Sequence, residues 1–297
     1  MLGFRKAERM QVLPDPSELT QAIAEAAGEL CQDTQAIKRS LPHVAAEVMA
    51  LCQQSTSDAL RIEKSVTRDP FISAQIVSVS NSPMFAPRMP IVSVRDAIVR
   101  IGLSNVNDIV MMVVTSSTMF RIRGFDEHVT RVTSRFPATA LAARLIAQSL
   151  RLPMESAFTA GLLHDIGDLI LLDRCVKTGK IRPEMIQEPV FYGVILDALH
   201  ANHAKVGAAV CTVWKLPTST VEAASHHHDY KLGGHHFSAN LVAASDTFVD
   251  IMGIGVPNKR ICDPAEAVFK DLGLKAEQVT AALDQFGKLL PSVRVFK

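Results

Sequence analysis

The chain has 297 residues, of which 48% are hydrophobic and 21% are charged, and 31 Lys and Arg against 30 Asp and Glu give a formal net charge of +1. This balance excludes an intrinsically disordered chain, which combines low apolar content with high net charge. It also lacks the basic excess of most nucleic-acid-binding proteins, and 5% aromatic residues offer few surfaces for base stacking. We therefore expect no nucleic-acid partner, although a local basic patch would not show in these averages.

The cysteines and apolar runs bear on the cellular compartment. Five cysteines occur without any CxxC pair, which indicates a reduced, intracellular chain. The apolar run Ile109–Val114 is far shorter than the roughly 20 residues that cross a bilayer. The first ten residues, MLGFRKAERM, lack the apolar core of a signal peptide. We expect a cytoplasmic protein that does not associate with membranes.

Helix start signals recur in the N-terminal half. Asp15-Pro16-Ser17-Glu18 combines an N-cap residue, a proline at the first helical position and a capping-box carboxylate. Pro42 and Asp69-Pro70 begin two further predicted helices, and Ser93 begins another that ends at Gly102. The helices after Pro42 and Pro70 each place apolar residues at i, i+4 and i+7, namely Val44, Val48 and Leu51, and Ile72, Ile76 and Val79.

The remaining segments also favour helices. The run IVMMVV has the composition of a buried strand, but its apolar stripe and the length of the segment after Ser104 favour a helix. The alanine-rich stretch from Pro137 to Leu150 is a strong helix former, and DPAEAVFKDLGL begins with another Asp-Pro start. Alternating strands joined by Asn-Gly turns are absent from the sequence. We predict an all-α fold with short irregular pieces at 81–90 and 231–237.

Eight of the ten histidines lie between positions 164 and 236, and the first of them belongs to GLLHDIGDLILL, residues 161–172. On a helical wheel His164, Asp165 and Asp168 share the side opposite the apolar arc. A histidine nitrogen and a carboxylate can bind one divalent cation, with Fe, Mn, Zn or Mg selected by geometry. A solvated polar face explains the same pattern, although Leu172 within the polar arc indicates partial burial there.

A second pair of histidines, His200 and His203, lies one turn apart on an apolar stripe that should face the interior. Either ligation of a metal or hydrogen bonding within the core accounts for such a pair. Further along, His226-His227-His228-Asp229 follows the helical run TSTVEAAS. The histidines at 235 and 236 lie in a glycine-containing loop, where we expect them to be solvated.

Asp246 is a carboxylate inside the apolar segment NLVAASDTFVDI. An unpaired buried carboxylate costs several kcal/mol, so Asp246 requires a cationic side chain, a metal or a solvent-filled cleft beside it.

The order His-Asp, His, His-His and Asp resembles the HD superfamily of metal-dependent phosphohydrolases, which are all-helical. The segments RDPFISAQIVSVSNSPMF and IVSVRDAIVRIGLSNVNDIV further resemble the N-terminal region of HDOD proteins, the HD-related output domain of bacterial signalling. AGLLHDIGDLIL, HAKVGAAVCTVWKLP and EAASHHH follow that family's pattern in order. The resemblance covers roughly residues 38–250. It implies an N-terminal bundle at 38–125 packed on an HD-like half at 126–250, with helical extensions at 1–37 and 251–297.

The resemblance also implies a set of metal-ligand positions: His164, Asp165, His203, His227, His228 and Asp246. HD enzymes carry one more histidine on an earlier helix, and its place is taken here by Arg135 or Phe136; an arginine there would repel a cation. Asp168 stands where the HDIGK form of cyclic-dinucleotide phosphodiesterases has a lysine, so it would repel a substrate phosphate. DYKLGG replaces the GYP motif of those enzymes.

These departures favour a non-catalytic signalling protein that acts by binding a signalling protein or a small ligand, with a degenerate HD site. Any cofactor would be a divalent metal such as Fe, Mn, Zn or Mg. The alternative is a metal-dependent phosphohydrolase acting on a phosphoester or a cyclic nucleotide, in which the metal activates a bound water. In that case His227 serves as a ligand or a proton donor.

Overall fold

The computed structural model of the protein describes residues 13–52, 54, 58–83, 85, 89–117, 120–255, 263 and 266–293. Within these ranges the chain is helical and contains no strand, which confirms the all-α prediction. No single helix in these ranges is long and apolar enough to cross a membrane. One sharply bent pair of helices, Val94–Ile101 and Asn105–Thr115, has the length and the apolar composition of a membrane span only when the two are taken together. The predictions made for residues 1–10 and for a helix start at Pro264 lie outside the described residues.

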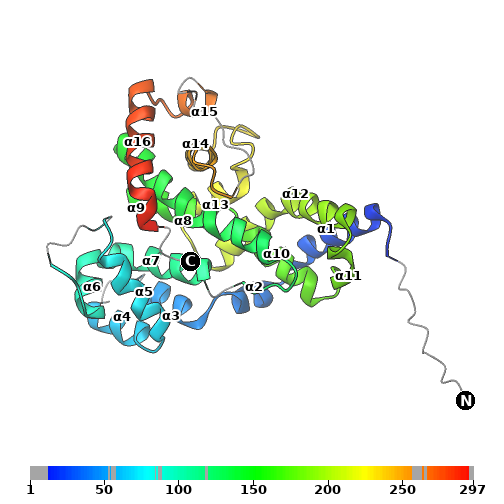
Figure 1. The fold of residues 1–297 in the computed structure, drawn as a ribbon, viewed down its shortest axis with the longest axis horizontal. Coiled ribbons are helices and arrows are strands. Elements are labelled where there is room, and N and C mark those ends of the chain that lie inside the picture. Colours follow the sequence, from blue (N-terminus) through cyan, green and yellow to red (C-terminus); the bar gives the residue numbers. More distant parts are fainter. Residues whose placement is uncertain are drawn as a thin grey trace, which may run out of the picture.

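The N-terminal bundle forms one lobe of the molecule (Figure 1). It consists of α3 (His43–Cys52), α4 (Ala59–Val66), α5 (Pro70–Ser80), α6 (Val94–Ile101) and α7 (Leu103–Ser117). Side chains of Asp58, Asp69 and Ser93 accept hydrogen bonds from the first turns of α4, α5 and α6. Gly102 ends α6 with a φ of 82°, a conformation that glycine adopts without strain. The run IVMMVV lies in α7 and is buried, as the helical interpretation requires.

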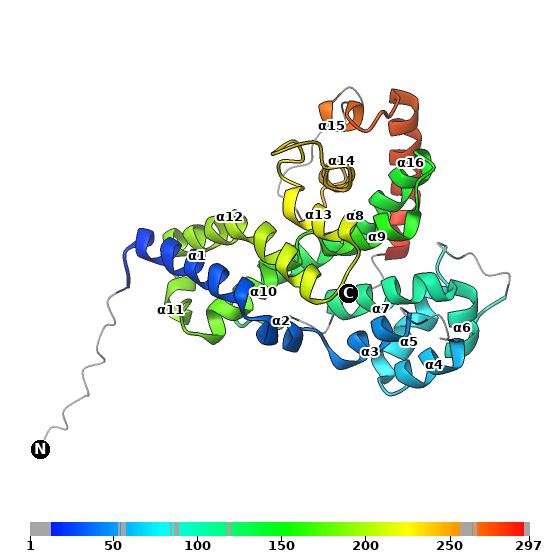
Figure 2. The same cartoon turned by 180° about the vertical axis from the view of Figure 1, so that it is seen from behind.

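A larger helical body lies beside this bundle (Figures 1 and 2). Its helices are α8 (Asp126–Ser149), α9 (Met154–Leu163), α10 (Ile166–Lys177), α11 (Pro183–Ile186), α12 (Pro189–Val213), α13 (Thr218–His226), α14 (Phe237–Ile251), α15 (Ala267–Lys270) and α16 (Ala276–Val293). The central helix α8 packs against α7, α9, α14 and α16. From the N-terminus, α1 (Pro16–Gln32) and α2 (Thr34–Ser40) pack on α12.

Two helix boundaries differ from the sequence prediction. Helix α8 begins at Asp126 and runs through Pro137, which lies inside the helix and is buried. Burial of α8 against several neighbours outweighs the hydrogen bond that an internal proline removes. In the C-terminal segment, α15 ends at Lys270 and Gly273 follows with a φ of 75°. The longer helix α16, which the sequence prediction did not separate, follows this turn and buries Phe286.

Small residues set the spacing of the helices that carry the polar cluster. A Cβ at Gly161 of α9 would lie 2.7 Å from the carbonyl oxygen of Thr139 in α8. A Cβ at Gly167 of α10 would overlap the backbone of α12 at His203 and Gly207. Because glycine has no side chain, α9 and α10 approach α8 and α12 closely. This close approach brings α8, α10 and α12 together around the histidines described next.

Candidate metal centre

His164 and Asp165 occupy a turn between two helices, because α9 ends at Leu163 and α10 begins at Ile166. The prediction that residues 161–172 form one amphipathic helix is therefore wrong at this point. Consecutive residues of a continuous helix diverge by about 100°, whereas in this turn both side chains face the same cluster. The glycines at 161 and 167 on either side of the turn permit the tight packing that holds it.

The polar face predicted here is not solvated. His164 is fully buried and Asp168 is only 8% exposed. Leu172 is also fully buried, as its position in the polar arc indicated. Burial of these side chains means that their charges and lone pairs must be satisfied by other groups of the protein or by a bound cation.

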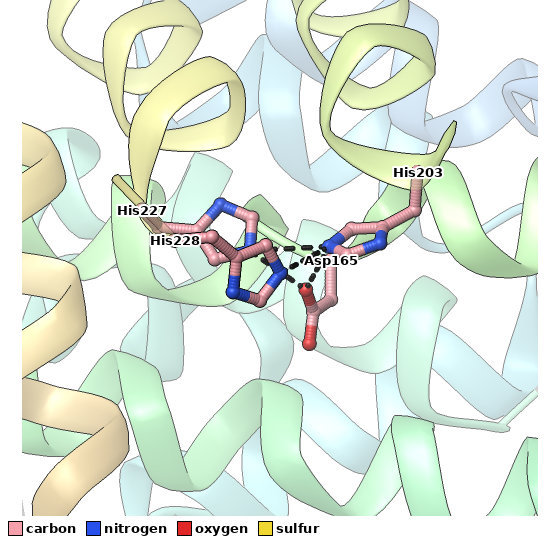
Figure 3. A group of neighbouring side chains, drawn as sticks. All are labelled: Asp165, His203, His227 and His228. Atoms are coloured by element: carbon pink, nitrogen blue, oxygen red, sulfur yellow. Dashed lines mark hydrogen bonds and ion pairs between the residues drawn. The ribbon is translucent and has the colours of Figure 1, made fainter. Parts of the chain in front are cut away.

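Four ligand atoms converge on one point in the protein: Asp165 Oδ1 and the Nε2 atoms of His203, His227 and His228 (Figure 3). Asp165 Oδ1 lies 3.2 Å from Nε2 of His203 and 3.2 Å from Nε2 of His227. The Nε2 atom of His203 is 3.2 Å from that of His227 and 2.9 Å from that of His228. The turn after α9, helix α12 and the turn after α13 supply these residues.

The backbone fixes the protonation of two of these imidazoles. His203 Nδ1 lies 2.8 Å from the carbonyl oxygen of His200, and His227 Nδ1 lies 3.1 Å from that of Ala223. A carbonyl accepts a hydrogen bond, so each Nδ1 carries the proton and each neutral ring has a lone pair on Nε2. Lone pairs on two neighbouring Nε2 atoms beside a carboxylate repel one another unless a proton or a cation lies between them.

This donor set fits a divalent transition metal. A tetrahedral cation with metal–nitrogen bonds of about 2.0–2.1 Å holds its ligand atoms about 3.3 Å apart. The four separations given above, 2.9–3.2 Å, are close to that value. Donation of Nδ1–H to a backbone carbonyl is also the usual support of a metal-binding histidine. Asp165, His203, His227 and His228 would therefore hold the metal.

His164 belongs to a second group, on the other oxygen of Asp165. Its Nδ1 lies 2.8 Å from the carbonyl oxygen of Gly161, which leaves Nε2 as the free ring atom. That Nε2 lies 3.1 Å from Asp165 Oδ2 and 3.2 Å from Asp246 Oδ2, yet it is buried and makes no well-aligned hydrogen bond. Asp165 thus faces the three histidines with one oxygen and His164 with the other.

Arg135 provides the positive charge of this second group. Its Nη2 lies 3.1 Å from Asp246 Oδ1, and its Nη1 donates to Asp250 Oδ1 at 2.8 Å and to the carbonyl oxygen of Ile254 at 3.0 Å. Thr139 donates a further hydrogen bond to Asp246 Oδ1 at 2.9 Å. Of the three possible neighbours that the sequence left open for Asp246, a cationic side chain is therefore present.

The backbone at Gly255 packs closely against the side chain of Arg135. Gly255 has a φ of 66°, and a Cβ there would lie 2.9 Å from Arg135 Cγ and 2.8 Å from the carbonyl oxygen of Arg131. Phe136, the other residue aligned with the missing histidine, is fully buried in the hydrophobic core. It is Arg135 that takes the place beside the carboxylates.

The electrostatics of the cluster follow from its carboxylates. Burial opposes a charge on His164, but Asp165 and Asp246 raise its pKa well above the ordinary value. Burial likewise opposes a charge on His203, and the hydrogen bond and charge of Asp165 raise its pKa. For His228, burial and then the neighbouring histidines His227 and His203 lower the pKa to about 3, so its ring is neutral and can donate a lone pair.

His128, which was not among the residues predicted for the site, lies beside Asp168. His128 Nε2 is 2.6 Å from Asp168 Oδ1, and its Nδ1 is 2.8 Å from Nη2 of Arg131. Its spacing of seven residues from Arg135, two helical turns on one face, was the signal that could have indicated it. The negative charge of Asp168, which the sequence suggested would repel phosphate, is thus paired within the protein.

The other histidines lie outside the four-residue group. His200 is exposed, so the prediction that its stripe faces the interior is wrong for this residue and holds for His203, which is 2% exposed. One turn of helix separates the two residues, and the edge of the buried stripe falls between them. His226 stacks on His236 with ring centroids 3.8 Å apart, and His235 is exposed.

The chain was compared with protein families, curated proteins and solved structures. The profile of the HDOD domain matches residues 39–230, whereas a comparison with curated proteins gave no match. A candidate metal-dependent phosphohydrolase from Shewanella amazonensis SB2B has a TM-score of 0.59 at 19% identity, over 89% of this chain and 99% of its own. An HDOD domain protein of unknown function from Geobacter sulfurreducens has a TM-score of 0.62 at 18% identity, over 86% and 92%.

A candidate signal transduction protein from Marinobacter aquaeolei VT8 has a TM-score of 0.60 at 19% identity, over 95% of this chain and 67% of its own. At such identities these structures show a shared fold. The profile match extends over more than half of the sequence. The chain belongs to the HDOD domain family.

Proposed function

We propose that this chain is a non-catalytic signalling protein that acts by binding a signalling protein or a small ligand. In this proposal Asp165, His203, His227 and His228 hold one divalent transition metal that stabilises the fold. The membership of the HDOD family and the fold shared with a candidate signal transduction protein support the signalling role.

The position of Arg135 carries the proposal. Two-metal hydrolysis requires a pair of cations roughly 3.5–4 Å apart. The oxygens of Asp165 point to two such places, one among the three histidines and one between His164 and Asp246. At the second place the guanidinium of Arg135 already neutralises Asp246. A cation bound there would face this fixed positive charge.

The composition of the first place supports a structural role. A site in which four protein side chains fill a tetrahedron has no open position for a water or substrate, as in structural zinc sites. Three imidazoles with one carboxylate favour zinc or iron over magnesium, which prefers oxygen ligands. Within the set of Fe, Mn, Zn and Mg, the donor set therefore favours Zn and Fe.

A metal-dependent phosphohydrolase is the second candidate, and the exposure of His228 favours it. If this outer ligand moved aside, a bound metal would have an open position, where it lowers the pKa of a water and stabilises charge on a phosphoryl group. In that case Asp165 would remain a ligand, and His227 would serve as a ligand or a proton donor.

Metal analysis and hydrolysis assays on the purified full-length chain separate the two candidates. We expect metal bound in a ratio of one per chain and no metal-dependent hydrolysis of bis(p-nitrophenyl) phosphate, cyclic mononucleotides or cyclic dinucleotides. Replacement of His203 by Ala should abolish metal binding, whereas the same change at the exposed His43 should not. Metal-dependent turnover that disappears in His164→Ala would overturn the proposal in favour of the hydrolase.

A further inference from the structure

His200 is an exposed histidine next to the four-residue group, and the metal site described above gives it no role. It lies on α12, one turn before His203. Its ring centroid is 4.6 Å from that of His228 and 5.3 Å from that of His203. Its side chain has these ring contacts, and no hydrogen bond or ion pair of that side chain is found in the described part of the chain.

The burial of the four residues shows from which side a cation can reach them. His203 and His227 are 2% and 4% exposed, and His164, behind them, is fully buried. His228 is the exposed member of the group. The solvent-facing side of the site is therefore the side on which His228 and His200 lie next to each other.

The backbone holds His200 in a fixed relation to the site. The carbonyl oxygen of His200 accepts the Nδ1–H of His203 at 2.8 Å. The residue that orients one buried ligand therefore carries a free imidazole at the mouth of the site. A hydrated cation exchanges its waters for protein ligands one at a time, so a first imidazole at the mouth shortens the search for the inner ligands.

We propose that His200 is a transient ligand for metal exchange at the site formed by Asp165, His203, His227 and His228. This inference rests on the proposed metal site and assigns His200 a role in uptake and release but none in the filled site. During uptake the imidazole lone pair of His200 replaces one water of the cation, and His228 then replaces His200. The released waters pass to solvent.

The test uses the metal-free full-length protein and Co²⁺, whose visible absorption reports tetrahedral ligation. Stopped-flow mixing gives the rate of uptake, and transfer to excess EDTA gives the rate of release. In His200→Ala we expect both rates to fall severalfold by the same factor, with the dissociation constant and the Co²⁺ spectrum unchanged. His200→Asp, which supplies a carboxylate ligand, should restore exchange, and His43→Ala on α3 is the control for removal of an exposed histidine.

Unchanged rates in His200→Ala would overturn the inference. A weaker equilibrium affinity with an altered Co²⁺ spectrum, as expected for His228→Ala, would also overturn it, because His200 would then be a ligand of the filled site. Failure of the wild-type protein to bind metal would overturn the metal site itself together with this inference. The equilibrium titration of the wild-type protein therefore distinguishes the failure of the proposed function from a failure confined to His200.

Discussion

His128 of α8 and Asp168 of α10 form a buried pair in which Nε2 and Oδ1 lie 2.6 Å apart. Arg131 donates to Nδ1 of the same imidazole, so the ring gives its Nε2–H to the carboxylate. The chain of Arg131, His128 and Asp168 links the exposed face of α8 to the turn that carries Asp165. Asp168 is therefore a structural partner of α8.

Replacement of His128 by Ala should destabilise the protein by about 2–4 kcal/mol, because it leaves a buried carboxylate without its donor. Urea unfolding monitored by circular dichroism measures the change. In the His128→Ala variant, the further change Asp168→Asn should lower the free energy of unfolding much less than it does in the wild-type protein, because the pair is already broken. Additive effects of the two substitutions would contradict the pairing.

The ion pairs of Arg135 with Asp246 and Asp250 can be tested in the same way. Arg135→Ala should destabilise the fold by roughly 3–5 kcal/mol, because Asp246 and Asp250 lose their shared cation. The exposed Arg123→Ala is the matched control and should change the unfolding free energy by a few tenths of a kcal/mol at most.

Arg135→His should have a different result, because it removes the fixed charge and adds a ligand beside His164 and Asp246. We expect this variant to bind a second equivalent of metal, which elemental analysis or a Co²⁺ titration measures. Unchanged stoichiometry in a folded Arg135→His variant would contradict the assignment of Arg135 as the group that replaces a cation.

Five of the six ligand positions that the family resemblance implies stand in the motifs HDIGD, HAKVG and SHHH, so most residues of the cluster could be named from the sequence. Their geometry was not predictable from a helical wheel. The wheel treats residues 161–172 as one helix, whereas the close contacts of Gly161 and Gly167 with α8 and α12 stabilise a turn at His164 and Asp165. Tertiary packing of this kind leaves no periodic signal in the sequence.

The partners of Arg135 and Asp168 were also beyond the sequence analysis. Arg135 contacts Asp250 and Ile254, more than one hundred residues further along the chain. His128 stands alone in its segment and matches no motif, so only its position two turns from Arg135 connects it with the site. Long-range ion pairs depend on how helices cross, which a single sequence does not specify.

The contact of α10 with α12 can be tested with a pair of glycines. Gly167→Ala should abolish the native packing, because its Cβ would overlap the backbone atoms of His203 and Gly207. Gly207→Ala should be tolerated, since a Cβ there meets its nearest neighbours at 3.4–3.6 Å. We expect loss of cooperative thermal unfolding and of metal binding in the first variant only. Equal behaviour of the two variants would contradict the observed crossing.

Asp108 gives the protein a specific dependence of stability on pH. It is 5% exposed in α7 and accepts a hydrogen bond from Thr159 of α9, so it lies where the N-terminal bundle contacts α9. Burial raises its pKa to about 7, against partial stabilisation of the charge by Thr159 and Arg144. In the unfolded chain the same carboxyl ionises at about 3.8.

Between about pH 4 and pH 7 the native state keeps the proton of Asp108 while the unfolded state has lost it, so stability falls as pH rises through this window. The contribution is fully present below about pH 4 and is lost above about pH 7, with an upper size of roughly 4 kcal/mol. In Asp108→Asn the neutral amide still accepts from Thr159, so this part of the slope should disappear. Urea unfolding at pH 5 and pH 8, with the exposed Asp197→Asn as the control, measures it. The change in unfolding free energy from pH 5 to pH 8 should be larger in the wild-type protein than in Asp108→Asn. An equal change in the two proteins would show that Asp108 is already ionised in the folded protein at pH 5.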